Sequence, residues 1–247
     1  LKPLEQKIIR DFNCSEFIFC SDSGLGSLNN RRFNSFSHRA YVITHSLKKM
    51  KEEDRKAAMN PAQFRKIGAQ KFVDLRTLDE TDEEVYSSVY YKEYPLITGD
   101  MVETLIVTYS PKYAAYQRKI REGQIERTQK ILCSPEKKRK GKNPNDPMRF
   151  VKRTTVTIDG EIAEKTVYDL DREQIEKEAM YDGFYAVVTN LEGDVNEIIR
   201  INQQRWEIEE NFRIMKDELG SRPAFVRRED RIKAHFMTCY ISLIVYR

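Results

Sequence analysis

The chain has 247 residues, 33% of them charged and 40% hydrophobic, a composition typical of a folded, highly charged protein and not of a disordered one. Its formal net charge of +4 is too small to indicate a nucleic-acid partner by itself. The four cysteines are scattered and include no C-x-x-C pair, which argues against a zinc site or a disulfide framework. The sequence shows no secretory signal and no apolar run of the roughly 18 residues that span a bilayer. We therefore expect a cytoplasmic protein without a membrane partner.

The first elements predict an α/β core. Residues 3–12 have a helical pattern, and residues 16–21 form a short apolar run that ends at the turn Asp22-Ser23-Gly24. Residues 27–36 predict a helix and residues 40–44 a second buried strand. Strand, turn, helix and strand in this order are typical of an α/β fold.

The middle of the chain is more polar. Residues 48–81 have little clean periodicity, whereas residues 89–95 and 101–109 predict strands. Ser110-Pro111 then predicts the start of a helix that ends near residue 132, because serine is a good N-cap and proline suits the first helical position. Residues 153–158 and 161–170 alternate around Asp159-Gly160, which predicts a hairpin.

A strongly basic loop lies at residues 133–153. Contact with a phosphate backbone is the functional interpretation, and a solvated or disordered segment is the equally open alternative. The cations expected to contact DNA are Lys137, Lys138, Arg139, Lys140 and Lys142.

The last part of the chain predicts a strand at residues 183–189 and a long helix at 195–219. Gly220 ends that helix, and residues 228–247 form a final amphipathic helix. The predicted organisation is one α/β core built from residues 1–48 and 181–247, with residues 49–180 as a strand-bearing insertion.

Asp22 is a candidate ligand-binding residue, because it follows a buried strand at the end where open α/β sheets bind ligands. Gly24 and Gly26 leave the turn bare, so a ligand can approach the backbone. A plain Asp-Ser-Gly turn is the structural alternative.

Residues 202–216 carry a second candidate cluster. At about 100° per residue, Arg205, Glu209 and Lys216 fall within roughly 40° of one another on the predicted helix. An acid between two cations is suited to hold a metal ion near phosphates, although such triplets are usually a solvated face with weak ion pairs. An adjoining apolar stripe is expected to be buried and consists of Ile201, Ile208, Phe212, Met215 and Leu219. Trp206, Cys239 and Tyr240 are also expected in the core.

The spacing of Asn202, Arg205, Glu209 and Lys216 resembles the Y-x2-R-x3-E-x6-K motif of transposases of the bacterial insertion-sequence-four superfamily, with asparagine in place of the tyrosine. Flanking segments are also similar to that family, and the resemblance covers nearly the whole chain. These segments are residues 20–25, 181–184, 188–190, 222–226 and 231–236.

This resemblance implies a DDE catalytic core with a ribonuclease-H-like fold that cleaves DNA at insertion-sequence ends and transfers the strands. Asp22 and Glu209 would be the second and third acids and would hold Mg²⁺ (or Mn²⁺). Asn202, Arg205 and Lys216 would contact DNA. The implied partners are transposon ends and target DNA, with a homodimer in the DNA complex, in the bacterial cytoplasm on the nucleoid.

The family's first acid has no match here. Asp11 is the only aspartate before Asp22 and lies in a predicted helix, so we expect the first acid upstream of Leu1 and this fragment to be inactive alone. Two alternatives remain: a non-catalytic nucleic-acid-binding module, and a metal-dependent nuclease of the same fold.

Overall fold

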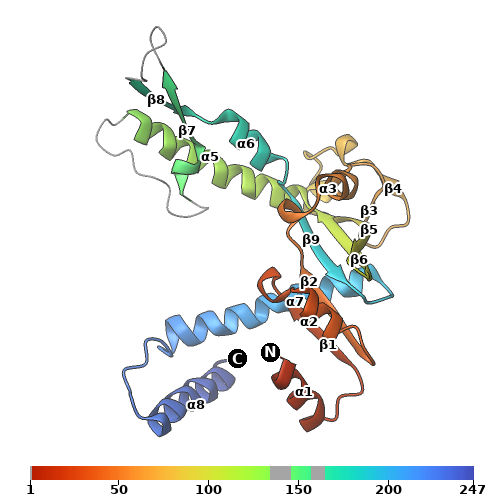
Figure 1. Cartoon of the computed structure of the whole chain (residues 1–247), viewed down its shortest axis with the longest axis vertical. Coiled ribbons are helices and arrows are strands. Elements are labelled where there is room, and N and C mark those ends of the chain that lie inside the picture. Colours follow the sequence, from red (N-terminus) through yellow and green to blue (C-terminus); the bar gives the residue numbers. More distant parts are fainter. Residues whose placement is uncertain (1, 134–145, 157–164) are drawn as a thin grey trace. The chain divides into compact units, whose positions relative to one another are not determined.

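The computed structural model describes residues 2–133, 146–156 and 165–247, with mixed α/β structure throughout (Figure 1). The predicted α/β class is confirmed. The chain divides into two compact units, the first made of residues 1–45, 97–104 and 187–247 and the second of residues 46–96 and 105–186. The division predicted at residues 48 and 180 stays a prediction.

Unit 1 begins with the predicted strand-turn-helix-strand order. Helix α1 (Lys2–Asp11) precedes strand β1 (Phe17–Ser21), and helix α2 (Leu28–Phe33) leads to strand β2 (Arg39–Thr44). The Ser27 hydroxyl caps α2 by accepting from the backbone N–H of Asn30. Strands β1 and β2 are parallel, so both end at one edge of the sheet.

The main sheet is mixed and has the strand order β1-β2-β9-β6-β5-β3-β4. Strand β9 (Phe184–Thr189) is antiparallel to β2. The remaining strands are β3 (Phe64–Lys66), β4 (Phe72–Val73), β5 (Tyr90–Thr98) and β6 (Met101–Tyr109). Strands β5, β6 and β9 each contain residues of both units.

Unit 2 contains the helices α3 (Glu52–Met59), α4 (Glu83–Ser87), α5 (Pro111–Cys133) and α6 (Arg172–Ala179). Strands β7 (Val151–Val156) and β8 (Lys165–Leu170) pair antiparallel, so the hairpin is confirmed. Val156 pairs with Lys165. The proposed turn at Asp159-Gly160 lies outside the described residues.

Long-range contacts tie the hairpin region of unit 2 together. The Thr128 hydroxyl on α5 donates to the backbone oxygen of Pro147 at 2.8 Å, and Arg149 pairs with Glu178 of α6 at 2.8 Å. Arg149 also stacks over the ring of Phe150. This cation of the basic loop is therefore committed to internal contacts.

The C-terminal helices of unit 1 differ from the prediction. Helix α7 (Val195–Arg213) continues as a π-helical turn (Ile214–Glu218) instead of one regular helix to residue 219, and Gly220, with φ +61°, ends it as expected. Helix α8 (Glu229–Tyr246) follows. Among the described residues, no helix is long and apolar enough to cross a bilayer.

For four residues of these helices, the prediction that they lie in the core is wrong. Trp206, Ile208, Phe212 and Tyr240 are each more than half exposed. Helix α7 buries its first turns, through Val195, Ile198 and Ile199, and the next buried residue is Ile214 in the π-helical turn, so Trp206, Ile208 and Phe212 stay uncovered. Tyr240 lies on α8, which buries only Cys239 and Leu243. Cys239 is buried, as expected.

Candidate active site at the end of β1

Asp22 lies directly after β1 and caps a 3₁₀ turn (Ser23–Leu25). Its Oδ1 accepts from the backbone N–H of Gly24 at 2.9 Å, and the side chain stays exposed. Gly26 is required by packing, because a Cβ there would lie 2.8 Å from Cγ2 of Ile43. The turn that carries Asp22 is therefore pressed against β2.

Helix α7 packs on β1 and β2 at this end of the sheet. The Cys20 thiol lies 3.9 Å from the backbone oxygen of Ile201, and one turn later Arg205 Nη1 donates to Thr44 Oγ1 at 3.3 Å. Burial, the largest effect, raises the pKa of the Cys20 thiol, whereas nearby Arg205 lowers it. The thiol is thus kept in its neutral form beneath the helix.

The parallel register relates Thr44 to Asp22. Ser21 is the partner of Ile43, so Asp22, which directly follows β1, and Thr44, the last residue of β2, are the next positions along the two neighbouring segments. Adjacent strands lie about 4.8 Å apart. The contact between Arg205 and Thr44 therefore holds α7 near the C-terminal ends of β1 and β2, where Asp22 lies.

Glu209 stands one turn beyond Arg205 on α7. Its Oε1 lies 3.2 Å from Arg205 Nη2, and its side chain is 65% exposed whereas that of Arg205 is 23% exposed. An exposed i,i+4 pair contributes little stability, so its effect is chiefly to orient the carboxylate. The separation of the Asp22 and Glu209 carboxylates stays a prediction.

Lys216 and Asn202 occupy different surroundings. Lys216 is exposed in the π-helical turn, where there are more residues per turn than in an α-helix. The uniform spacing of 100° per residue used to place it beside Glu209 therefore does not apply to it. Asn202 is half-buried on α7, and the predicted DNA contacts of both residues remain to be tested.

A buried polar network that the sequence did not reveal supports the Asp22 turn. Glu103 on β6 is fully buried and accepts hydrogen bonds from Arg31 of α2 and Tyr41 of β2. The pKa of the Tyr41 hydroxyl is raised, chiefly because the group is buried and secondly because it donates a hydrogen bond to Glu103. The network fixes α2, the helix that follows the Asp22 turn, against two strands. The sequence feature that could have revealed this network is a glutamate, Glu103, within the mostly apolar strand predicted at residues 101–109.

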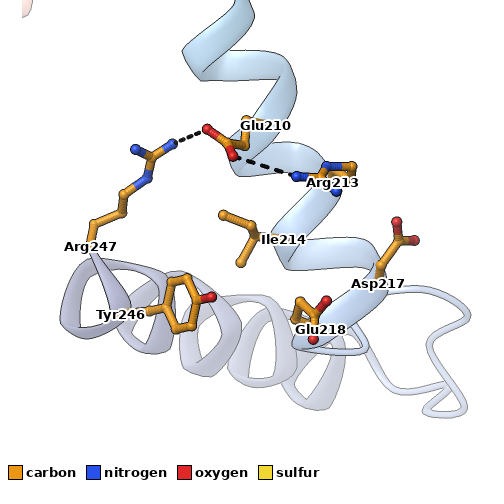
Figure 2. A pocket seen from close by; sticks show the side chains of 7 residues that line it. All are labelled: Glu210, Arg213, Ile214, Asp217, Glu218, Tyr246 and Arg247. Carbon is orange, nitrogen blue, oxygen red and sulfur yellow. Dashed lines mark hydrogen bonds and ion pairs between the residues drawn. The ribbon is translucent and has the colours of Figure 1, made fainter.

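A small pocket of about 220 Å³ lies between the end of α7 and the end of α8 (Figure 2). Glu210 at its edge pairs with Arg247 at 3.1 Å and with Arg213 at 3.5 Å. Lys216 does not line it. Its lining carries three carboxylates, those of Glu210, Asp217 and Glu218, against the two guanidiniums of Arg213 and Arg247, so the pocket lacks the cationic character of a phosphate site. Among the described residues these acids form no group arranged to hold a metal ion.

A divalent ion at this end of the sheet would need oxygen ligands. Carboxylate oxygens suit Mg²⁺, and Asp22 and Glu209 both supply them on exposed side chains. The described part of the chain contains no group of three or more His, Cys, Asp or Glu side chains arranged for a metal. The donor chemistry of these two side chains suits a divalent ion, and their role as its ligands stays a prediction.

Comparison with protein families decides the identity. The model of the family described as "Transposase DDE domain" matches residues 12–245. The chain belongs to this transposase family. Comparisons with curated proteins and with solved structures gave no match.

The DDE transposase family implies DNA as the partner and phosphoryl transfer on DNA as the reaction, and its members generally use divalent ions. The matched range contains Asp22, Glu209 and α7. Thr44 and Glu103, which support these elements, were missed by sequence reasoning. The predicted DNA contacts at residues 137–142 lie outside the described residues.

Proposed function

We propose that this transposase domain cleaves DNA at insertion-sequence ends and transfers the strands, with Asp22 and Glu209 as the second and third acids of an insertion-sequence-four type, ribonuclease-H-like core. The observation that carries the proposal is the chain of contacts from Glu209 through Arg205 to Thr44. It connects the acid on α7 with the strand next to the one that Asp22 follows.

Asp22 and Glu209 would hold Mg²⁺ or Mn²⁺. Divalent ions held by these residues would supply charge stabilisation at the attacking and leaving oxygens of the phosphodiester. Arg205 orients Glu209 and adds positive charge near the DNA phosphates. Lys216, which is exposed, and Asn202 would contact the DNA backbone and keep the scissile phosphate in register. We further propose that two copies act together on DNA, which rests on the family resemblance.

The test compares DNA cleavage by Asp22→Asn and Glu209→Gln with that by Glu207→Gln, in the full protein with Mg²⁺ and a duplex that carries an insertion-sequence end. Glu207 is an exposed acid of the same helix, so its variant makes the same chemical change outside the proposed site. Loss of a metal ligand removes several kcal/mol of transition-state stabilisation, so we expect the cleavage rate to fall about 10³-fold or more.

Binding to the same duplex separates the proposal from its alternatives. We expect Glu209→Gln to bind nearly as well as the original protein, because the amide keeps the shape of the side chain. Cleavage by Glu209→Gln at the original rate would show that Glu209 is not the third acid. Cleavage without strand joining by the original protein would favour the nuclease.

The basic loop is a separate proposal. If Lys137, Lys138, Lys140 and Lys142 bind phosphates, neutralising all four should weaken binding equally for every DNA sequence. The slope of log affinity against log salt should fall by about 0.9 for each phosphate that the variant no longer neutralises. An unchanged slope would leave the loop as a solvated segment.

A further inference from the structure

One face of helix α5 in unit 2 is basic and aromatic. At about 100° per residue, the residues of this face fall within an arc of roughly 120°, and no carboxylate of the helix falls in that arc. Its side chains are exposed, and its members are Lys112, Lys119, Arg127, Lys130, Tyr113 and Tyr116. We call this set the α5 face.

The cations of α5 divide into two groups by their contacts. On the other side of the helix, Arg118 pairs with Glu80 at 3.1 Å, and Arg121 pairs with Asp182. No residue of the α5 face has a carboxylate within ion-pair distance in the described part of the chain. The fold therefore uses one set of cations in ion pairs and leaves the other set without an ion pair among the described residues, although Glu122 and Glu126 lie on the same helix just outside the face.

Two stacked tyrosines add hydroxyl groups to the α5 face. The rings of Tyr113 and Tyr116 stack with centroids 6.4 Å apart and an interplanar angle of 20°. They are 41% and 60% exposed. Both rings are exposed on the helix face that carries the cations, so their hydroxyl groups are available to donate to phosphate oxygens.

Gly123 lies in the middle of this face. Glycine in a helix interior is destabilising relative to alanine, so its presence at this position needs an explanation. A Cβ at this position would meet nothing within 4 Å, so no internal packing requires glycine. Arg127 Nε donates to the backbone oxygen of Gly123 at 3.1 Å, which draws that cation toward the bare backbone. The arrangement lets a large ligand approach the helix closely.

We propose that the α5 face binds the phosphate backbone of duplex DNA, as a contact surface additional to the site at Asp22 and Glu209. From Lys112 to Lys130 the helix rises about 27 Å, which is long enough for its cations to reach phosphates at more than one point along a duplex. Four cations without an ion pair among the described residues, spread over this length, suit the repeated negative charges of a DNA backbone. The inference rests on DNA as the substrate in the proposed function and is independent of the catalytic acids.

The experiment measures binding of the full protein to a 40-bp duplex over a range of salt concentrations. Lys119→Gln/Lys130→Gln is compared with Lys56→Gln/Lys177→Gln, which removes the same charge from exposed lysines of unit 2. These control lysines already pair with Glu52 and Glu173 at 2.7 and 2.6 Å. We expect the slope of log affinity against log salt to fall by about 1.8 for the first pair and to stay constant for the second.

Gly123 supplies a test that leaves charge unchanged. Gly123→Ala should raise the midpoint of thermal unfolding, because alanine favours the helix. Gly123→Gln should fold as stably as the original protein yet bind the duplex about tenfold more weakly, because its side chain occupies the space of the approaching backbone. Tenfold weaker binding without loss of stability would support the proposal.

Equal slopes for the two lysine pairs, or unimpaired binding by Gly123→Gln, would overturn the proposal. So would a loss of affinity for a glutamate-rich peptide with DNA binding unchanged, since that would assign the face to an acidic protein. Cleavage by Glu209→Gln is measured separately, so failure of the α5 face leaves the catalytic assignment unaffected, and failure of that assignment leaves the DNA-binding result standing.

Discussion

Arg205 connects strand β2 with the acid on α7. Its guanidinium donates to Thr44 at 3.3 Å and pairs with Glu209 at 3.2 Å. Arg205 and Glu209 were recognised from their spacing alone, because a four-residue interval places them on one helix face. Thr44 was not recognised, since a threonine at the end of a strand is too common to stand out in a sequence.

Thr44→Val should lower the rate of DNA cleavage about tenfold. The substitution removes the hydroxyl but keeps the shape, and a hydrogen bond to a charged group is worth about 1.5 kcal/mol or more. Thr44→Ser retains the acceptor and should restore most of the rate. Equal rates for the valine and serine variants would show that the hydroxyl does not position Arg205.

His45 gives unit 1 a pH-dependent contribution to stability. Burial, and then the positive charge of Arg31, lower its pKa below the ordinary value of 6.5, whereas Glu103 opposes the shift. As the pH falls below 6.5, His45 of the unfolded chain takes up a proton before His45 of the folded protein does. The contribution of neutral His45 to stability is therefore present above pH 6.5 and is lost as the pH falls further.

The check is the free energy of unfolding in urea at pH 7.5 and pH 5. The original protein should lose more stability between the two than His45→Gln, which has no proton to bind at this position. An equal loss in both proteins would contradict the assignment.

At the scale of elements, the sequence predicted those with a strong local pattern. The strand at residues 101–109 and the start of α5 at Pro111 are as expected, because apolar runs and Ser-Pro caps act locally. Helices α3 and α6 were missed because they are short and polar and bury little of their surface. The π-helical turn and the exposed Phe212 depend on tertiary packing, which a period of 3.6 residues does not describe.

Gly183→Ala should destabilise the protein by about 2–4 kcal/mol, measured by urea unfolding. Gly183 has φ +79°, and a Cβ there would lie 2.7 Å from the Tyr109 ring and 2.9 Å from the backbone oxygen of Ser110. Gly68→Ala is the matched control, because Gly68 has φ +81° but open space around it, and we expect a cost of about 1 kcal/mol. Equal costs would show that backbone conformation, and not crowding, fixes glycine at position 183.

At the scale of the whole molecule, family membership and the separate candidate acids could be predicted from the sequence, and their spatial relation could not. Asp22 and Glu209 are 187 positions apart in the sequence. The parallel register of β1 and β2, the packing of α7 on both strands and the contact from Arg205 to Thr44 indicate that α7 reaches the end of the sheet where Asp22 lies. The buried network around Glu103 likewise joins three elements that no local pattern relates.

The central claim, that Asp22 and Glu209 both reach one cluster of divalent ions, is tested most directly by a crystal structure of the protein bound to insertion-sequence-end DNA in Mn²⁺. Anomalous scattering locates the ion without assuming its ligands. We predict a cluster of ions held by both side chains, whose carboxylates should then lie within roughly 10 Å of each other. An ion bound elsewhere, or the two carboxylates on opposite sides of the core, would contradict the account.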